Sequence, residues 1–337
     1  MHSEKRNKKV LPTLTLVISG VLQFYRKRCD LMGKAMAAAK KIAKSPFAPL
    51  ARVAFDVFAK AQFLCLNIKW KLSGIKKPTA EQAQQAAQKV TFMFKSFERQ
   101  KQAKMLYKNI HKYYPNARVV IADDSKIPLK INAKKNPPTI IHMPFNSGLS
   151  KGLNLALAEI QTEYLMRMDD DELLTPLSNV YEELCFLEAH SEIDLVGFVP
   201  LTAGKCTPVQ KIARNYNQFD MKNAYKPLKV PHLTKIDENH IVYGKVPNIF
   251  LARTEKVREI GWDDNIRMID HHEFFTRAAG NLVSVMNPNT AVFHIHNMFD
   301  NYYNKFRSDF SDDYYYIQGK MIAAKKAMKS NKNQQHK

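Results

Sequence analysis

Beyond Lys89, short β-rich runs alternate with segments of helical periodicity, and this alternation limits the folds open to the chain. Strand–helix–strand alternation is typical of a parallel sheet covered by helices. The β-rich runs cover residues 90–94, 117–122, 139–143 and 164–168, and helical spacing covers residues 97–114 and 150–160. We therefore predict an α/β fold with a mostly parallel sheet and flanking helices.

Two acidic clusters follow strands of this predicted sheet. They are Asp123-Asp124-Ser125 after the second run and Asp169-Asp170-Asp171 after the fourth. Open α/β sheets bind ligands at the carboxyl ends of their strands, so both clusters fall where a ligand is expected. Carboxylate oxygens there suit Mg²⁺ or Mn²⁺. The alternatives are an Asx turn for the first cluster and a cap for a helix beginning near Leu173 for the second.

A glycine-bearing loop precedes the predicted helix at residues 150–160. It contains Asn146, Gly148 and Lys151, and Ser150 is the expected N-cap. Such a loop can bring backbone N–H groups close to a ligand, and Lys151 can reach a phosphate. The loop matches neither the Walker A nor the G-x-G-x-x-G pattern, so it gains meaning only together with the acidic strand ends.

The net charge of +21 is concentrated in the first quarter of the chain. Residues 1–89 contain 18 Lys or Arg against four acidic residues, whereas the remainder is only mildly basic. A basic leader on an otherwise ordinary domain favours attachment to an anionic membrane. A uniformly basic surface would instead have favoured nucleic acid, which we do not expect as a partner.

Apolar residues recur with helical spacing between residues 47 and 72. They are Leu50, Ala54, Val57, Ala61, Leu64, Ile68 and Leu72. This helix is either an interfacial membrane helix or a helix packed on the main domain or on a second subunit. Residues 10–25 are too short and too polar to span a membrane, and residues 79–88 are predicted to be a polar connector.

The motifs, taken in order, resemble a nucleotide-sugar glycosyltransferase of the GT-A class, family 2-like, with a Rossmann-like sheet. The resemblance rests on residues 119–125, the loop and helix at 146–154, and the pair Asp169-x-Asp171. Residues 248–262 and 271–275 closely resemble the β-1,4-N-acetylgalactosaminyltransferases of the ganglioside GM2/GD2 synthase type. The resemblance covers roughly residues 90–300 and leaves residues 1–88 uncovered.

This resemblance implies roles at the matched positions. Asp169 and Asp171 would bind Mn²⁺ or Mg²⁺ on the diphosphate of a UDP-sugar, and His294 would complete the metal site. The family's Asp before that histidine is Phe293 here, which is a departure from the pattern. The donor-binding residues would be Asp123, Asp124, Ser125, Asn146, Gly148, Lys151 and Asp170.

The segment Asp270-His271-His272-Glu273-x-x-x-Arg277 has the spacing of an acid-rich segment in related inverting enzymes. The aspartate that acts as the base in those enzymes corresponds to His271 here. Asp270 corresponds to the first acid of their segment. Inverting transfer needs a base on the acceptor hydroxyl. Asp270, His271 and Glu273 are the candidates, and the sequence leaves open whether Asp270 or His271 takes the proton.

We therefore predict three regions: a basic helical region (1–88) that associates with a membrane or a partner, a glycosyltransferase domain (89–300) and a helical, basic tail (301–337). The expected activity is metal-dependent inverting transfer of a sugar, an N-acetylhexosamine, from a UDP-sugar to a glycan or glycolipid acceptor. The alternatives are a basic membrane- or nucleic-acid-binding protein without catalysis and a sugar nucleotidyltransferase. The expected location is peripheral, on the cytoplasmic face of a bacterial inner membrane, or the Golgi in a eukaryote, and a homo-oligomer is possible.

Overall fold

A mixed sheet lies at the centre of the computed structural model, which describes residues 41–335 except Cys206 and Asn223. The strand order is β3-β2-β1-β4-β8-β6-β9-β5, and β7 pairs with β9. From β3 to β4 neighbouring strands are parallel, whereas β8 runs antiparallel to both β4 and β6. The strands are β1 (Val90–Ser96), β2 (Arg118–Asp123), β3 (Thr139–His142), β4 (Tyr164–Asp169), β5 (Glu172–Leu174), β6 (Leu195–Thr202), β7 (Ile241–Val242), β8 (Phe250–Arg253) and β9 (Ser284–His294).

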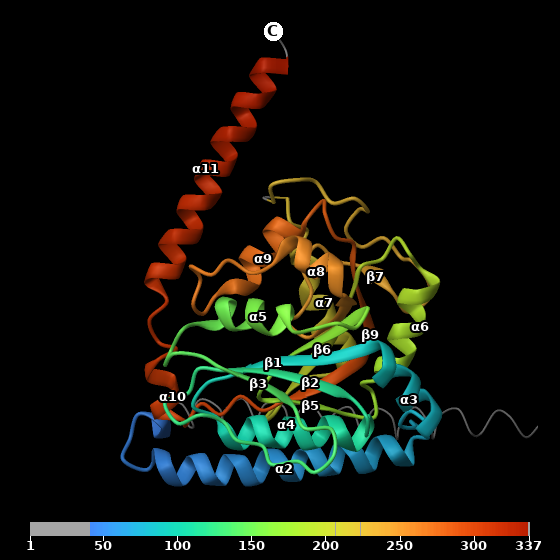
Figure 1. Ribbon diagram of the computed structural model, residues 1–337, viewed down its shortest axis with the longest axis vertical. Coiled ribbons are helices and arrows are strands. Elements are labelled where there is room, and N and C mark those ends of the chain that lie inside the picture. Colours follow the sequence, from blue (N-terminus) through green and yellow to red (C-terminus); the bar gives the residue numbers. More distant parts are fainter. Residues whose placement is uncertain (1–40, 206, 223, 336–337) are drawn as a thin grey trace, which may run out of the picture.

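Helices cover both faces of this sheet, which confirms the predicted α/β class. Figure 1 shows α4 and α5 on opposite faces, with α2 on the outer side of the body. The helices are α2 (Ala48–Leu72), α3 (Ala80–Lys89), α4 (Gln100–Tyr113), α5 (Leu149–Ala158), α6 (Val180–Ala189), α7 (Val209–Arg214), α8 (Thr254–Ile260), α9 (Asp270–Ala278), α10 (Asn301–Lys305) and α11 (Ser311–Gln335).

Strand β1 is buried on both faces of the sheet, which explains why a nearly continuous run of apolar residues predicted it. Its side chains point alternately to the two faces of the sheet. Phe92 and Phe94 enter the core cluster that contains Leu106 of α4, whereas Met93 enters the cluster that contains Leu153 of α5. A strand that is buried on both faces needs apolar residues at nearly every position.

The two acidic clusters lie at one edge of the sheet, as predicted. Strands β2 and β4 both pair in parallel with β1, with Ser96 opposite Asp123 and Lys95 opposite Asp169. The helix expected near Leu173 is absent there, because β5 continues the chain as a short strand antiparallel to β9. This pairing places Glu172 opposite His294 and so brings the end of β9 to the acidic triple.

The region before the sheet is helical where it is described. The helix predicted within residues 47–72 is confirmed as α2, whereas the predicted polar connector at 79–88 was wrong, because α3 occupies it. Thr79 and Gln82 form a capping box that starts α3. Residues 1–40 lie outside the described part of the chain. Among the described helices, none is long and apolar enough to span a membrane.

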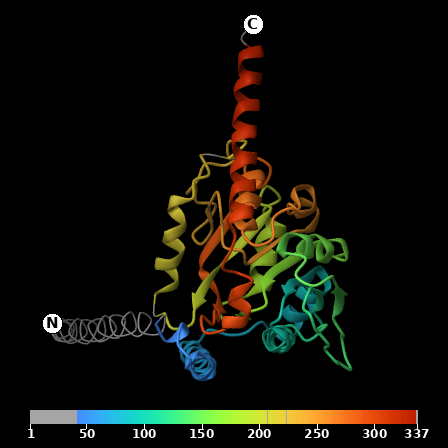
Figure 2. The same ribbon diagram turned by 90° about the vertical axis from the view of Figure 1, so that its left-hand side faces the viewer.

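The C-terminal helix α11 projects from the body, as Figure 2 shows. Its first turn is anchored by the buried Asp313, whose carboxylate accepts hydrogen bonds from the backbone N–H groups of Arg267 and Met268 at 3.0 and 2.7 Å. These bonds fix the segment that leads into α9.

Candidate active site

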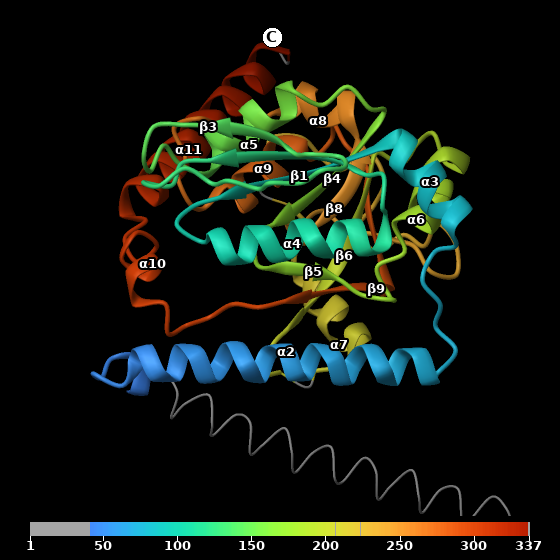
Figure 3. The ribbon, with the colours of Figure 1, turned by 60° about the horizontal axis from the view of Figure 1, so that its bottom comes forward.

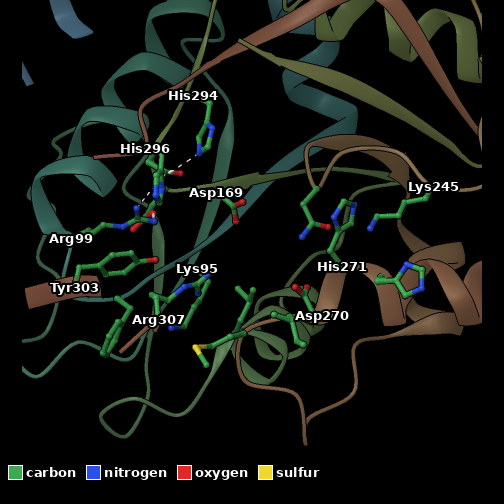
Figure 4. Close-up of a pocket in the computed structure, with 18 residues that line it drawn as sticks. Lys95, Arg99, Asp169, Lys245, Asp270, His271, His294, His296, Tyr303 and Arg307 are labelled. Atoms are coloured by element: carbon green, nitrogen blue, oxygen red, sulfur yellow. Dashed lines mark hydrogen bonds and ion pairs between the residues drawn. The ribbon is translucent and has the colours of Figure 1, made fainter. Parts of the chain in front are cut away.

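A cavity of about 480 Å³ opens at the edge of the sheet where β1 and β4 end. Its walls come from these two strands, the loop before β8, the start of α9, the end of β9 and the α10 region. Figure 4 shows two groups on its sides: Arg99, His294 and His296, and Lys245, Asp270 and His271. Asp169 lies between them in this view.

The three side chains of Asp169, Asp170 and Asp171 do not share the same partners. Asp169 is partly exposed and forms an ion pair with the fully buried Arg167, with an N–O distance of 2.9 Å. Asp170 and Asp171 are buried and both pair with the guanidinium of Arg99, at 2.7 Å for Asp171. The second carboxylate oxygen of Asp170 has no hydrogen-bond partner among the described residues.

Burial and charge separate the pKa values of the two buried acids. Burial raises the pKa of Asp170 to about 7, against the opposing effect of Arg99. Burial also acts to raise the pKa of Asp171, but Arg99 and His294 hold it well below its usual range. Of these two buried acids, Asp171 is the one whose ionised form is favoured by its surroundings.

Asp171, His294 and His296 form a group that fits a divalent cation. One ligand atom from each residue lies within 4.8 Å of the others, and the His294 Nε2 atom is 3.6 Å from Asp171 Oδ2. Carboxylate oxygen and imidazole nitrogen together suit Mn²⁺ better than Mg²⁺, which prefers oxygen ligands. Asp169, predicted as a ligand, lines the cavity but lies outside this group.

The opposite side of the cavity carries the candidate bases. Asp270 is buried at the start of α9, and burial raises its pKa to about 6. Its Oδ2 atom lacks a hydrogen-bond partner within the described part of the chain. His271 donates from Nε2 to the Val246 carbonyl at 2.6 Å, and burial, with a smaller effect of Lys245, lowers its pKa well below the usual range. His271 is therefore neutral at pH 7, with Nδ1 as its unprotonated nitrogen.

The first acidic cluster lies behind the cavity and does not line it. Asp124 pairs with Lys95, which does line the cavity, and accepts a hydrogen bond from the Gly148 backbone N–H at 3.1 Å. Asp123 accepts from the Ser125 hydroxyl at 2.6 Å and from the Leu129 backbone N–H at 2.7 Å. In this structure these carboxylates order the strand end and the loop after it.

The remaining predicted residues also lie outside the cavity lining. Asn146 has a positive φ of 56°, and its carbonyl accepts from Arg267 at 3.0 Å. Lys151 is exposed on α5. Glu273 pairs with Arg277 at 2.7 Å and with Lys320 at 2.5 Å, which explains its burial without a place at the cavity.

Sequence comparison finds one family profile that matches part of the chain. Residues 94–236 match the profile of the family described as Glycosyl transferase family 2. Residues 94–236 are thus similar to a glycosyl transferase family 2 domain. This confirms the resemblance drawn from the acidic strand ends, although the matched segment ends before Asp270 and His294.

Curated relatives of the chain include two N-acetylgalactosaminyltransferases. It is 32% identical over 204 residues to human beta-1,4 N-acetylgalactosaminyltransferase 1, covering 57% of this chain and 36% of the relative. It is 30% identical over 218 residues to mouse beta-1,4 N-acetylgalactosaminyltransferase 2, covering 61% of this chain and 39% of the relative. The matches thus span less than half the length of these relatives.

Solved structures with a related arrangement include two glycosyltransferase complexes. One is S. aureus TarS 1–349 in complex with UDP-GlcNAc, with a TM-score of 0.47 and 16% identity over 64% of this chain and 61% of that chain. The other is the mannosyltransferase PcManGT from Pyrobaculum calidifontis with GDP-Man and Mn²⁺, with a TM-score of 0.43 and 13% identity over 76% of this chain and 70% of that chain.

Several residues that line the cavity were not assigned from the sequence. They are Lys95, Arg99, Lys245, Asn248, His296, Tyr303 and Arg307. Lys95 and Arg99 follow the same rule as the acids, because they lie at and just beyond the carboxyl end of β1. His296 is two residues beyond His294, so the pair His-x-His was the available signal. Tyr303 belongs to a group of aromatic residues near the C-terminus, for which a core or packing role was the favoured prediction, and Arg307 had no signal, since only the fold brings it there.

Proposed function

We propose that this chain is a metal-dependent inverting glycosyltransferase that moves an N-acetylhexosamine from a UDP-sugar to a hydroxyl of a glycan or glycolipid acceptor. The observation that carries the proposal is that Asp171, His294 and His296 lie across one cavity from Asp270 and His271, in a chain whose residues 94–236 match the family 2 profile. The donor class is supported by the N-acetylgalactosaminyltransferases that the chain resembles.

Asp171, His294 and His296 are the residues that would hold Mn²⁺ or Mg²⁺. A cation held there would neutralise charge on the leaving diphosphate. Arg99, Lys95 and Arg307 place further positive charge along the same cavity. Their side chains would bind and orient the phosphates of the donor before transfer.

Asp270 is the better candidate for the base that takes the acceptor proton. A general base works best when its pKa lies near the operating pH, and the pKa of Asp270 is about 6. His271 is neutral, but its strongly lowered pKa makes its protonated form unfavourable. In this proposal the hydroxyl proton moves to the free Oδ2 atom of Asp270, while His271 orients the acceptor through Nδ1.

A sugar nucleotidyltransferase is the second candidate, because it also needs an acidic metal site on a similar sheet. The two enzymes differ in what they consume: a UDP-sugar or a nucleoside triphosphate. The test is a panel of UDP-, GDP- and CMP-sugars and UTP, each with and without Mn²⁺, followed by thermal stabilisation and donor hydrolysis. We expect a metal-dependent rise in melting temperature with UDP-N-acetylhexosamines. Stabilisation and turnover with UTP and a sugar phosphate would instead establish the second candidate.

The basic residues of the first quarter of the chain support a location at a membrane surface. We propose peripheral attachment at the cytoplasmic face of a bacterial membrane, with a Golgi membrane as the eukaryotic alternative. A salt-dependent affinity for DNA without UDP-sugar binding would favour the non-catalytic alternative.

A further inference from the structure

Helix α2 turns a long apolar stripe toward solvent. Its members are Leu50, Val53, Val57, Leu64, Ile68 and Leu72, which are between 50% and 83% exposed. Their spacing of three, four or seven residues places them on one side of the helix. With a rise of about 1.5 Å per residue, the α2 stripe is roughly 33 Å long. A soluble surface rarely carries a continuous apolar feature of this size without a partner.

The opposite side of α2 already packs on the domain, so the α2 stripe is not needed for the core. Ala59 is fully buried and shares a cluster with Leu173 of β5 and Phe293 of β9. The rings of Phe63 and Phe293 lie 5.3 Å apart. Figure 3 shows α2 along the outer side of the body. The helix is therefore fixed to the domain by one side, and its other side is exposed among residues 41–335 that the structure describes.

Charge around the α2 stripe indicates the chemistry of its partner. Between residues 41 and 78 the only acidic residue is Asp56, which is turned inward and accepts a hydrogen bond from Asn297 at 2.7 Å. Lys60 and Lys71 are exposed on one flank of the stripe. The other basic residues of this region are Lys41, Lys44, Arg52, Lys69, Lys76 and Lys77. Apolar residues flanked by lysines complement a surface with an apolar interior and anionic head groups.

We propose that α2 docks on an anionic phospholipid bilayer, with the α2 stripe at the boundary between head groups and acyl chains. A second copy of this chain would bring the same lysines together at a dimer interface, where charge is normally depleted. The inference goes beyond the transfer reaction, and it stands or falls without it.

Docking through α2 would affect the cavity, because α2 is bonded to a segment that connects residues of the cavity wall. Asn297 donates to Asp56 and to the Arg52 carbonyl at 3.2 Å, and Arg52 forms an ion pair with Asp300 at 3.0 Å. The bonded segment joins His294 and His296 to Tyr303, which all line the cavity. If the proposed function holds, the acceptor is then a glycan carried on a lipid of the same bilayer.

The test measures binding of the full chain to vesicles of phosphatidylcholine, with and without phosphatidylglycerol. The wild type should bind the anionic vesicles and dissociate as salt is raised. The double variant Val57→Asp/Leu64→Asp alters exposed positions and should fold normally, while its partition coefficient falls by at least about tenfold. Leu155→Asp, on the α5 surface, is the matched control and should bind like the wild type.

Two results would overturn the proposal. Equal binding of the double variant and the wild type would show that the attachment does not depend on the α2 stripe. A lipid-free dimer that the double variant converts to a monomer, without any vesicle binding, would make a second copy the partner. Binding of a UDP-sugar in solution, measured on the same samples, reports on the proposed function separately.

Discussion

Replacing Asp270 with Asn should stabilise the protein while removing its activity. Burial raises the pKa of Asp270 from 3.8 to about 6, so ionisation of this carboxyl is less favourable in the folded than in the unfolded chain. Each pKa unit corresponds to about 1.4 kcal/mol, which gives up to about 3 kcal/mol of destabilisation once the group is ionised in both states. The neutral amide of Asp270→Asn avoids this cost at pH 7.

The pH dependence has a definite sign. The folded-state pKa lies above the unfolded one, so the stability associated with protonated Asp270 is complete below pH 3.8 and is lost as the pH rises through about 6. The gain from Asp270→Asn, measured by urea unfolding, should therefore be large at pH 7 and fall progressively below pH 6.

Transfer by Asp270→Asn should fall by a factor of about 10² to 10⁴, as expected for loss of a general base. Glu192→Gln, at an exposed loop position, is the control and should change neither stability nor activity. A destabilised Asp270→Asn variant that keeps its turnover would refute both the electrostatic account of this site and its assignment as base.

Three further predictions concern the cavity and its support. Arg99→Met should raise the affinity for Mn²⁺ in calorimetric titrations, because the guanidinium and the cation share Asp171; weaker binding would show that Arg99 supports the metal site. His271→Ala should lower kcat far more than the affinity for UDP, whereas an equal loss in both would indicate a structural role. Phe293→Ala should reduce the free energy of unfolding by about 3–5 kcal/mol in urea, since its ring is fully buried against α2; a loss below about 1 kcal/mol would show that this packing matters little.

Much of the fold could be predicted because its signals are local. The apolar runs of β1, β2 and β4 and the acids at the ends of β2 and β4 were enough to place two clusters at one edge. The antiparallel strands of the sheet could not be predicted from such local signals. Strand β5 has only three residues, and its pairing with β9 joins segments about 120 residues apart.

The site could be predicted in outline, but the partners of each side chain could not. Sequence spacing placed Asp169 and Asp171 in one metal-binding pair, with Asp171 favoured as the direct ligand, but it could not show that Arg167 pairs with the first and Arg99 with the second. Glu273 has the spacing of a catalytic acid, yet Arg277 and Lys320 bind its carboxylate. These differences depend on rotamers and on charges from distant elements, which a linear pattern does not contain. The assigned roles of the site residues stay predictions.

In the proposed function, Asp171, with His294 and His296, binds the cation on which the UDP-sugar donor depends. The most direct test is calorimetric titration of UDP-N-acetylgalactosamine into the wild type and Asp171→Asn, each with and without saturating Mn²⁺. We predict that Mn²⁺ strengthens donor binding to the wild type at least about tenfold and has no effect on Asp171→Asn, whose melting temperature confirms an intact fold. Equal enhancement by Mn²⁺ in both proteins would show that Asp171 does not hold the cation.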